Sequence, residues 1–87
     1  MEFDWDAANI DHIAKHEIST EECEQAYHNG PMVINQQKRH GERRLLCLGH
    51  TASGRLLTFV ATERGGRIRF VTAFPMNKKQ REIYRGG

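Results

Sequence analysis

The chain has 87 residues, of which 38% are hydrophobic and 28% are charged, and its formal net charge is +2. This balance is typical of a folded protein and excludes an intrinsically disordered chain. No apolar run approaches the ~18 residues that a membrane span needs, and the first residues lack the pattern of a signal peptide. We therefore expect a cytoplasmic protein without membrane association, in which residues 1–87 form a single domain.

Two helices are predicted in residues 4–31. In the first, apolar residues recur at i, i+3 and i+4, and an aspartate at position 4 or 6 provides the N-cap, so the helix should end near His16. In the second, Ser19 and Glu22 have the spacing of a capping box, and the Asn-Gly-Pro sequence at 29–31 stops the helix.

Strand-like segments follow at residues 32–35, 43–49, 54–62 and 67–74. The turn-forming sequences HTASG and ERGGR link them closely, which favours antiparallel pairing. Pro75 ends the last strand, and Asn77 and Gln80 have capping-box spacing for a final helix through Tyr84. The order α-α-β-β-β-β-α predicts an α+β domain, with two N-terminal helices and a C-terminal helix packed on a curled four-stranded antiparallel sheet.

Charge is distributed unevenly along the chain. Eight of the 11 acidic residues lie in the first 25 positions, whereas 12 of the 13 basic residues lie from Lys38 onward. Such a distribution indicates a one-sided positive surface that binds a phosphate-bearing ligand or an acidic protein partner. Solvated strands whose arginine stems cover apolar surface explain the same pattern equally well.

The arginines of the predicted strands are candidates for a phosphate site. Glu42 and Arg44 are two residues apart, so both should project from one face, and Arg55 is expected near them across a hairpin. Arg67 and Arg69 should share one face of the last strand. Several guanidiniums on one face would grip a phosphate and stabilise its transition state. A ladder of exposed ion pairs is the structural alternative, and composition alone favours it.

Alternation along the last strand divides its remaining residues between two faces. Val71 and Ala73 are expected beside the arginines, and the opposite face is expected to carry Ile68, Phe70, Thr72 and Phe74. The aromatic residues of the strands are expected in the core. A stand-alone nucleic-acid-binding domain, which would need exposed aromatics to stack on bases, is therefore a weaker interpretation.

Neither a metal ion nor another cofactor is expected. His12 and His16 have the spacing of two metal ligands on a helix, but no further ligand completes a site. Cys23 and Cys47 lie on apolar stripes and are assigned to the core. RNA cleavage needs no metal, because the 2′-hydroxyl is the nucleophile and protein groups move the protons. Glu42, Tyr84 and the five histidines are candidates, a neutral imidazole suits the base best, and the sequence leaves open which one.

In their order and spacing, several motifs together resemble the BrnT-type toxins of bacterial type II toxin–antitoxin systems. They are WDAANIDHIAKHEIS with the following acidic pair, the E-x-R of Glu42 and Arg44, the GRLL at 54–57, RIRFVTA at 67–73, and the basic helix that ends at Tyr84. The resemblance implies a RelE-like fold and metal-independent cleavage of RNA that inhibits growth. It also implies neutralisation by a BrnA-like ribbon-helix-helix antitoxin, whose complex binds operator DNA.

The resemblance and the charge pattern give two sets of candidate site residues. The catalytic set consists of His16, Glu42, Arg44, Arg55 and Arg69. The RNA-binding set consists of Arg67, Lys78, Lys79, Arg81 and Tyr84.

Two positions depart from the family pattern. Phe74 stands where family members generally have an arginine, and Gln80 stands where a glutamate is usual. The first change removes a fixed positive charge, and the second removes a group that can exchange a proton. These departures favour an alternative hypothesis, in which the chain is a catalytically impaired binding module that acts as antitoxin partner and transcriptional co-repressor.

Overall fold

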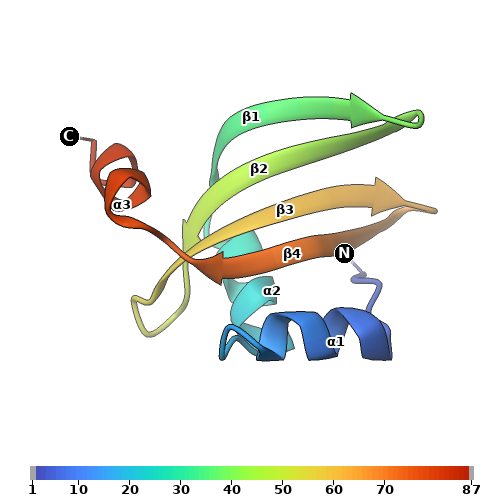
Figure 1. Cartoon of the computed structure of the whole chain (residues 1–87), viewed down its shortest axis with the longest axis horizontal. Coiled ribbons are helices and arrows are strands. Elements are labelled where there is room, and N and C mark those ends of the chain that lie inside the picture. Colours follow the sequence, from blue (N-terminus) through green and yellow to red (C-terminus); the bar gives the residue numbers. More distant parts are fainter. Residues whose placement is uncertain (1, 87) are drawn as a thin grey trace.

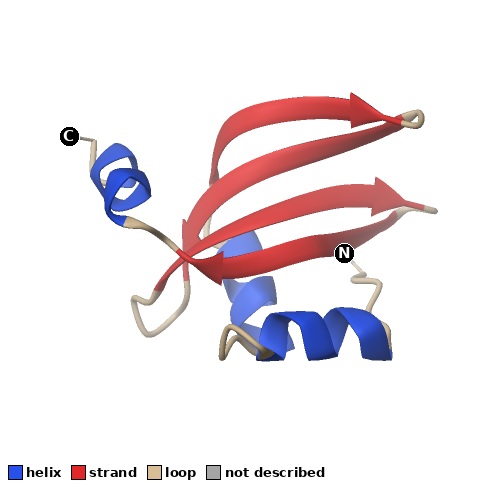
Figure 2. Cartoon of the chain, in the orientation of Figure 1, coloured by secondary structure: helices blue, strands red, loops and turns tan. Residues whose placement is uncertain are grey.

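The computed structural model describes residues 2–86, which form three helices and one four-stranded sheet (Figure 1, Figure 2). The helices are α1 (Ala7–Ala14), α2 (Thr20–His28) and α3 (Lys78–Tyr84). The strands are β1 (Met32–Arg39), β2 (Glu42–His50), β3 (Leu56–Arg64) and β4 (Arg67–Pro75). Each strand pairs antiparallel with the next along the chain, in the order β1-β2-β3-β4. The predicted α+β class, element order and antiparallel sheet are confirmed.

The predicted caps begin all three helices. In α1, the Asp6 side chain accepts a hydrogen bond from a backbone N–H of the first turn at 2.8 Å. In α2, Ser19 and Glu22 form both hydrogen bonds of a capping box, and Asn77 and Gln80 do the same in α3. These bonds satisfy N–H groups that the first turn of a helix leaves without partners, so local sequence locates each helix start.

Two-residue turns connect β1 to β2 and β3 to β4. Backbone φ is +51° at His40 and +76° at Gly41, and it is +60° and +79° at Gly65 and Gly66. Positive φ at both central positions is typical of a type I′ turn, whose twist matches that of the flanking strands. Because the first turn begins only at His40, β1 continues to Arg39, beyond the predicted end of this strand at residue 35.

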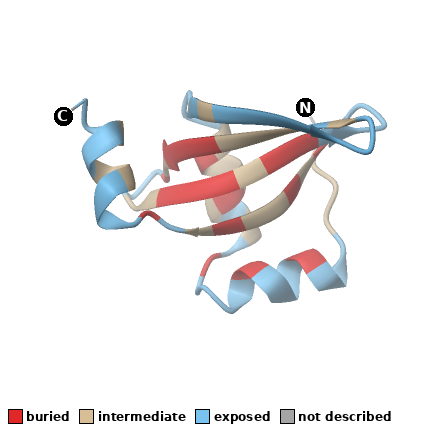
Figure 3. Ribbon diagram, turned by 45° about the horizontal axis from the view of Figure 1, so that its top comes forward, coloured by how far each residue is buried: buried red, intermediate tan, exposed pale blue. Residues whose placement is uncertain are grey.

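Helices α1 and α2 cover one face of the sheet, and the core lies between them and the strands (Figure 1). Phe59 and Phe70 are its largest fully buried side chains, and Trp5 stacks on Phe70 with ring centroids 5.2 Å apart. β3 is buried almost continuously from Leu57 to Thr62, buried positions alternate along the first part of β4, and β1 is exposed along most of its length (Figure 3). The core therefore depends on three strands and two helices.

A β-bulge interrupts β4 at Val71. Ala61 pairs with Phe70, but the preceding residue Val60 pairs with Thr72, so Val71 is an extra residue on β4. An inserted residue shifts the two-residue period of a strand by one position. After the bulge, the β4 positions that would have faced the core therefore face the opposite side of the sheet, and the other positions face the core.

Because of the bulge, the predicted faces are wrong for the β4 side chains that follow it. Ala73 is fully buried in the core, whereas Thr72 and Phe74 point to the opposite face, where their β3 partners Val60 and Thr58 also lie. The sequence predicted the reverse, with Thr72 and Phe74 beside Phe70, because strict alternation takes no account of a bulge.

Helix α3 lies against one end of the face that α1 and α2 leave uncovered (Figure 1). The Thr58 hydroxyl donates to Oε1 of Gln80 at 2.8 Å, and Nδ1 of His50 lies 2.7 Å from the Tyr84 hydroxyl. We call this side of the sheet the open face, because within residues 2–86 no helix covers its central part.

Candidate functional site

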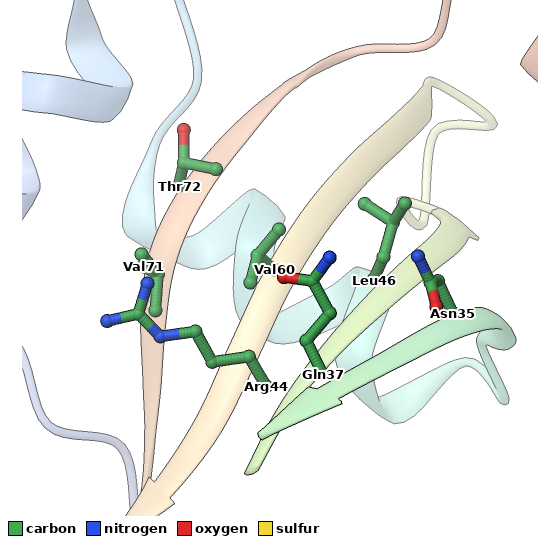
Figure 4. A pocket seen from close by; sticks show the side chains of 7 residues that line it. All are labelled: Asn35, Gln37, Arg44, Leu46, Val60, Val71 and Thr72. Carbon is green, nitrogen blue, oxygen red and sulfur yellow. The ribbon is translucent and has the colours of Figure 1, made fainter. Parts of the chain in front are cut away.

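The open face contains a groove of about 280 Å³, which we call the central groove (Figure 4). Its lining residues are Asn35, Gln37, Arg44, Leu46, Val60, Val71 and Thr72. All four strands contribute, because residues directly opposite one another on paired strands project from the same face. The groove combines aliphatic side chains with one arginine, so it suits an anionic ligand that also has an apolar part.

Arg44 is the predicted site residue best placed to bind such a ligand. It pairs with Gln37 on β1 and with Thr62 on β3, and it extends across the sheet toward Val71 (Figure 4). Its Nε lies 3.4 Å from Oε1 of Glu42, and among residues 2–86 no hydrogen bond engages its two terminal amino groups. A guanidinium in this state can bind a phosphate bidentately.

Glu42 is held between two guanidiniums. Its Oε2 accepts a hydrogen bond from Nη2 of Arg64 at 3.0 Å, and its Oε1 faces Arg44. The hydrogen bond from Arg64 lowers the pKa of Glu42, and the interaction with Arg44 adds to this effect, which outweighs partial burial. A carboxylate that is stabilised in its ionised form holds cations in place well and donates a proton poorly. Glu42 therefore suits the positioning of Arg44 better than acid catalysis.

Arg69 lies in the same cross-strand row as Arg44, with Thr62 between them. Two strand spacings of ~4.8 Å place the two arginine backbones roughly 10 Å apart. The Arg69 side chain is only 17% exposed, with Nη2 2.8 Å from Asp6 and Nη1 3.6 Å from Asp4. A hydrogen bond from the α1 backbone lowers the pKa of Asp6, and Arg69 adds to this shift. Arg69 thus shares the face of Arg44, but two carboxylates already balance its charge.

Arg55 lies apart from the other predicted catalytic residues. Its Nη1 donates to both carboxylate oxygens of Glu22 at 3.1 Å and to the backbone oxygen of Glu17 at 2.7 Å. The prediction that Arg55 lies near Glu42 and Arg44 is wrong, because the turn that carries it is at the far end of β2. A rise of ~3.3 Å per residue separates the ends of this nine-residue strand by roughly 26 Å. Arg55 ties the β2–β3 turn to the α1–α2 loop.

Two polar side chains of α1 and one from the turn after it lie near β4. Asn9 and His12 are three residues apart, a spacing that places them on one side of α1, and the ring of His16 in the following turn lies 6.0 Å from the His12 ring. Asn9 donates its Nδ2–H to a β4 carbonyl at 3.0 Å, and Nε2 of His12 lies 2.9 Å from Oγ1 of Thr72. The His16 ring lies 6.2 Å from the ring of Phe74, measured between centroids. Because Thr72 also lines the central groove, it connects His12 to that groove.

The predicted RNA-binding residues do not form one cluster. Lys78 and Lys79 are exposed on α3, whereas Arg67 begins β4 at the opposite end of that strand and lies 3.6 Å from Glu2. Two others are engaged within the fold, since Arg81 donates to a backbone oxygen at 2.8 Å and Tyr84 is hydrogen-bonded to a β2 histidine. A ligand that spans the open face would meet them at its ends.

The two departures from the family pattern have different surroundings. Gln80 Oε1 accepts hydrogen bonds from Thr58 and from the backbone of Asn77, at 2.8 and 2.9 Å. A glutamate would accept both bonds, so Gln80 fulfils the structural part of this position. Phe74 is half-buried on the side of Thr58, and its apolar ring places no charge at this position of the open face.

The two cysteines are buried in the core, as predicted. Burial raises the pKa of Cys23 to about 12, with an added contribution from the flanking carboxylates, and burial raises the pKa of Cys47 to about 11. The thiolate is the reactive form of cysteine, so neither side chain is suited to nucleophilic catalysis.

Several lining residues were not predicted as part of a site. Gln37 was missed because the expected first strand ended at residue 35, and Thr72 because it was assigned to the other face. Asn35 lay within the expected strand but was not considered as a site residue. His12 was considered as a metal ligand and, together with the other four histidines, as a proton-transfer candidate, but it was not placed at the sheet. Its alignment with Asn9 on one side of α1 was the available signal that it faces the sheet.

Comparisons with known proteins identify the family of the chain. None of the helices within residues 2–86 has the length and apolar character that crossing a membrane requires. A comparison with curated proteins gives no match. The model of a family described as "Ribonuclease toxin, BrnT, of type II toxin-antitoxin system" matches residues 5–80, a range that contains α1, α2 and all four strands. The chain therefore belongs to the BrnT family of ribonuclease toxins of type II toxin–antitoxin systems.

Proposed function

We propose that the chain is a metal-independent endoribonuclease that cleaves cellular RNA, messenger RNA in particular, and thereby inhibits growth. The observation that carries the proposal is Arg44 in the central groove, with two terminal amino groups open to a phosphate. Membership of a ribonuclease family supports this chemistry. A guanidinium that is already in position stabilises the charge that develops on the phosphate in the transition state.

The proposed reaction uses the nucleophile that RNA carries. The 2′-oxygen attacks the adjacent phosphorus, and the bond from phosphorus to the 5′-oxygen breaks. The products are a 2′,3′-cyclic phosphate and a 5′-hydroxyl, so a base must take the 2′ proton and an acid must protonate the 5′-oxygen. His12, hydrogen-bonded to Thr72 at the groove, and His16, whose ring in the turn after α1 lies 6.0 Å from the His12 ring, are the proposed proton-transfer pair.

Two of the other predicted catalytic residues assist Arg44 in this proposal. Glu42 positions the Arg44 guanidinium, and Arg69 adds a second positive centre in the same cross-strand row. Arg55 is left out of the reaction centre, because its guanidinium binds Glu22 at the far end of β2. Arg67, Lys78, Lys79 and Arg81 would attract the RNA backbone at the ends of the open face.

Type II membership implies a protein antitoxin as partner. We expect a BrnA-like ribbon-helix-helix protein that covers the open face with an acidic segment, because opposite charge favours docking on Arg44 and its neighbours. The resulting complex would bind operator DNA through the antitoxin. Both proteins would act in the cytoplasm.

Expression of the chain alone in bacteria tests the proposal. Induction should arrest growth and fragment total RNA, and co-expression of the adjacent ribbon-helix-helix reading frame should restore growth. Normal growth with intact RNA, in cells that contain the folded protein, would overturn the proposal.

Phe74 favours a second candidate function, that of a catalytically impaired module which binds the antitoxin and acts as co-repressor. The bulge turns position 74 away from the core and toward the side of the open face, where an arginine would add charge. Removal of one preorganised transition-state contact costs about 10²–10³ in rate. Binding to the antitoxin and operator DNA without any RNA cleavage by the purified chain would favour this alternative.

A further inference from the structure

The central groove extends from Arg44 toward β1, where it has a different chemical character. Gln37 lies directly opposite Arg44, and Asn35 lies directly opposite Leu46. Both carboxamides line the groove beside the aliphatic side chains of Leu46 and Val60 (Figure 4). Among residues 2–86, no hydrogen bond engages either carboxamide, so both retain a donor and an acceptor for a ligand.

We propose that this part of the central groove binds one unpaired nucleobase of the RNA whose phosphate Arg44 holds. The proposal rests on the proposed function and adds a substrate-recognition site to it. Asn35 and Gln37 would hydrogen-bond the polar edge of the base, and Leu46, Val60 and Val71 would cover its apolar face.

The size and composition of the groove favour a base over larger occupants. Its volume of about 280 Å³ is just below the range of about 300–1,000 Å³ typical of sites for drug-sized ligands. It therefore has room for a single flat ring system. Carboxamides are the side chains that present a paired donor and acceptor to a base edge. Single-stranded RNA exposes such edges, because its bases are free of partners.

The arrangement also explains why the recognition site lies beside the arginine. Neighbouring strands are ~4.8 Å apart, so Gln37 is one strand spacing from Arg44. A nucleotide places its base within a few bonds of its phosphate, so one nucleotide can reach both. A protein segment from the antitoxin is the competing occupant, and it would use the same carboxamides for backbone hydrogen bonds.

Binding of octanucleotides to the complete chain tests the proposal. The probes are 2′-O-methyl oligomers of A, C, G and U, which lack the nucleophile, and an abasic oligomer with the same number of phosphates. The wild type should bind at least one base-containing oligomer about tenfold more tightly than the abasic oligomer. Gln37→Leu should reduce this ratio about fivefold and leave the affinity for the abasic oligomer nearly unchanged.

Gln36→Leu is the matched control, because Gln36 is also exposed on β1 but pairs with Leu45 and points away from the groove. It should leave all affinities unchanged, and thermal unfolding should show that both variants are folded. Equal binding of all oligomers by the wild type would overturn the proposal. If Gln37→Leu still prefers the base-containing oligomer to the abasic one as strongly as the wild type does, the proposal is also overturned. If that variant has at the same time lost affinity for the antitoxin, the groove is instead a binding site for the antitoxin.

Cleavage of unmodified RNA is measured separately, so the two proposals can fail independently. Cleavage without discrimination between base-containing and abasic oligomers would contradict only the recognition site. Discrimination without cleavage of unmodified RNA would contradict the proposed nuclease activity and leave the base contact in place.

Discussion

Phe70 and Phe74 are four residues apart on β4, yet their side chains lie on opposite faces of the sheet. Phe70 is fully buried against α1 and α2, whereas Phe74 pairs with Thr58 on the side of the open face. The bulge at Val71 causes this exchange, because it inserts one residue into the alternation. Position 74 is therefore placed to influence a ligand of the open face.

Phe74→Arg combined with Gln80→Glu should raise RNA cleavage about 10²-fold, because it adds a fixed cation beside the bound phosphate. Initial rates of cleavage by purified proteins at equal concentration provide the measurement. Phe74→Leu with Gln80→Glu is the control, since it changes the ring without adding a positive charge, and it should leave the rate nearly unchanged. Equal rates for the wild type and the arginine variant would show that position 74 does not limit activity.

His12→Ala should lower kcat about 10²–10⁴-fold, because the variant loses a proton-transfer group at the groove. The bell-shaped pH dependence of the rate should lose either its acidic or its basic limb. A variant that is only destabilised would keep both limbs. His40→Asn is a suitable control, because His40 is exposed in the β1–β2 turn and asparagine tolerates its positive φ. An unchanged profile in His12→Ala would assign proton transfer to another residue.

Acid should destabilise the fold partly through Glu22. Partial burial raises the pKa of Glu22, but hydrogen bonds from the Ser19 backbone and from Arg55 outweigh it and bring the pKa below its ordinary value of 4.5. The folded state thus binds this proton less tightly than the unfolded chain does. The contribution of Glu22 to stability is complete above about pH 4.5 and is lost as the pH falls through the lowered pKa.

Urea unfolding at several pH values measures this effect. Glu22→Gln should lower the midpoint at neutral pH and flatten its decline between about pH 5 and pH 3. Glu63→Gln, which removes an exposed carboxylate of β3, should keep the wild-type slope. Parallel pH dependences for the wild type and Glu22→Gln would contradict the assignment.

Gly49→Ala should destabilise the protein by about 1–3 kcal/mol, because α2 packs closely on β2 at this residue. A Cβ there would lie 3.0 Å from the backbone oxygen of Ala26 and 3.4 Å from the Phe59 ring. Relief would require the helix to move away from the sheet. Chemical unfolding measures the loss, and an unchanged free energy of unfolding would show that α2 adjusts without cost.

Features set by neighbouring residues were predictable from the sequence. The capping pairs Ser19–Glu22 and Asn77–Gln80 and the turn at Gly65–Gly66 depend on local hydrogen bonds and backbone freedom, and all three are present. The element order and antiparallel sheet followed from them, since short links bring consecutive strands together.

Features set by distant residues were not predictable in the same way. The bulge at Val71 arises from pairing between β3 and β4, and no local residue signals it. Arg55 binds Glu22, which lies 33 positions earlier in the chain, so strand proximity gave the wrong neighbours. Gln37 joined the site because β1 continues past its predicted end and places it opposite Arg44, and Asn35, the last residue of the predicted strand, joined it through its pairing with Leu46.

Cleavage of RNA by the purified chain, with and without Arg44, tests the central claim most directly. In the presence of a chelator, the wild type should cut a single-stranded RNA and leave 2′,3′-cyclic phosphate ends. Arg44→Ala should be slower by about 10²–10³-fold. Arg43→Ala should retain the wild-type rate, because Arg43 is the exposed neighbour that points to the other face of β2. Equal rates for Arg44→Ala and the wild type, or cleavage that stops when the chelator is added, would contradict the account.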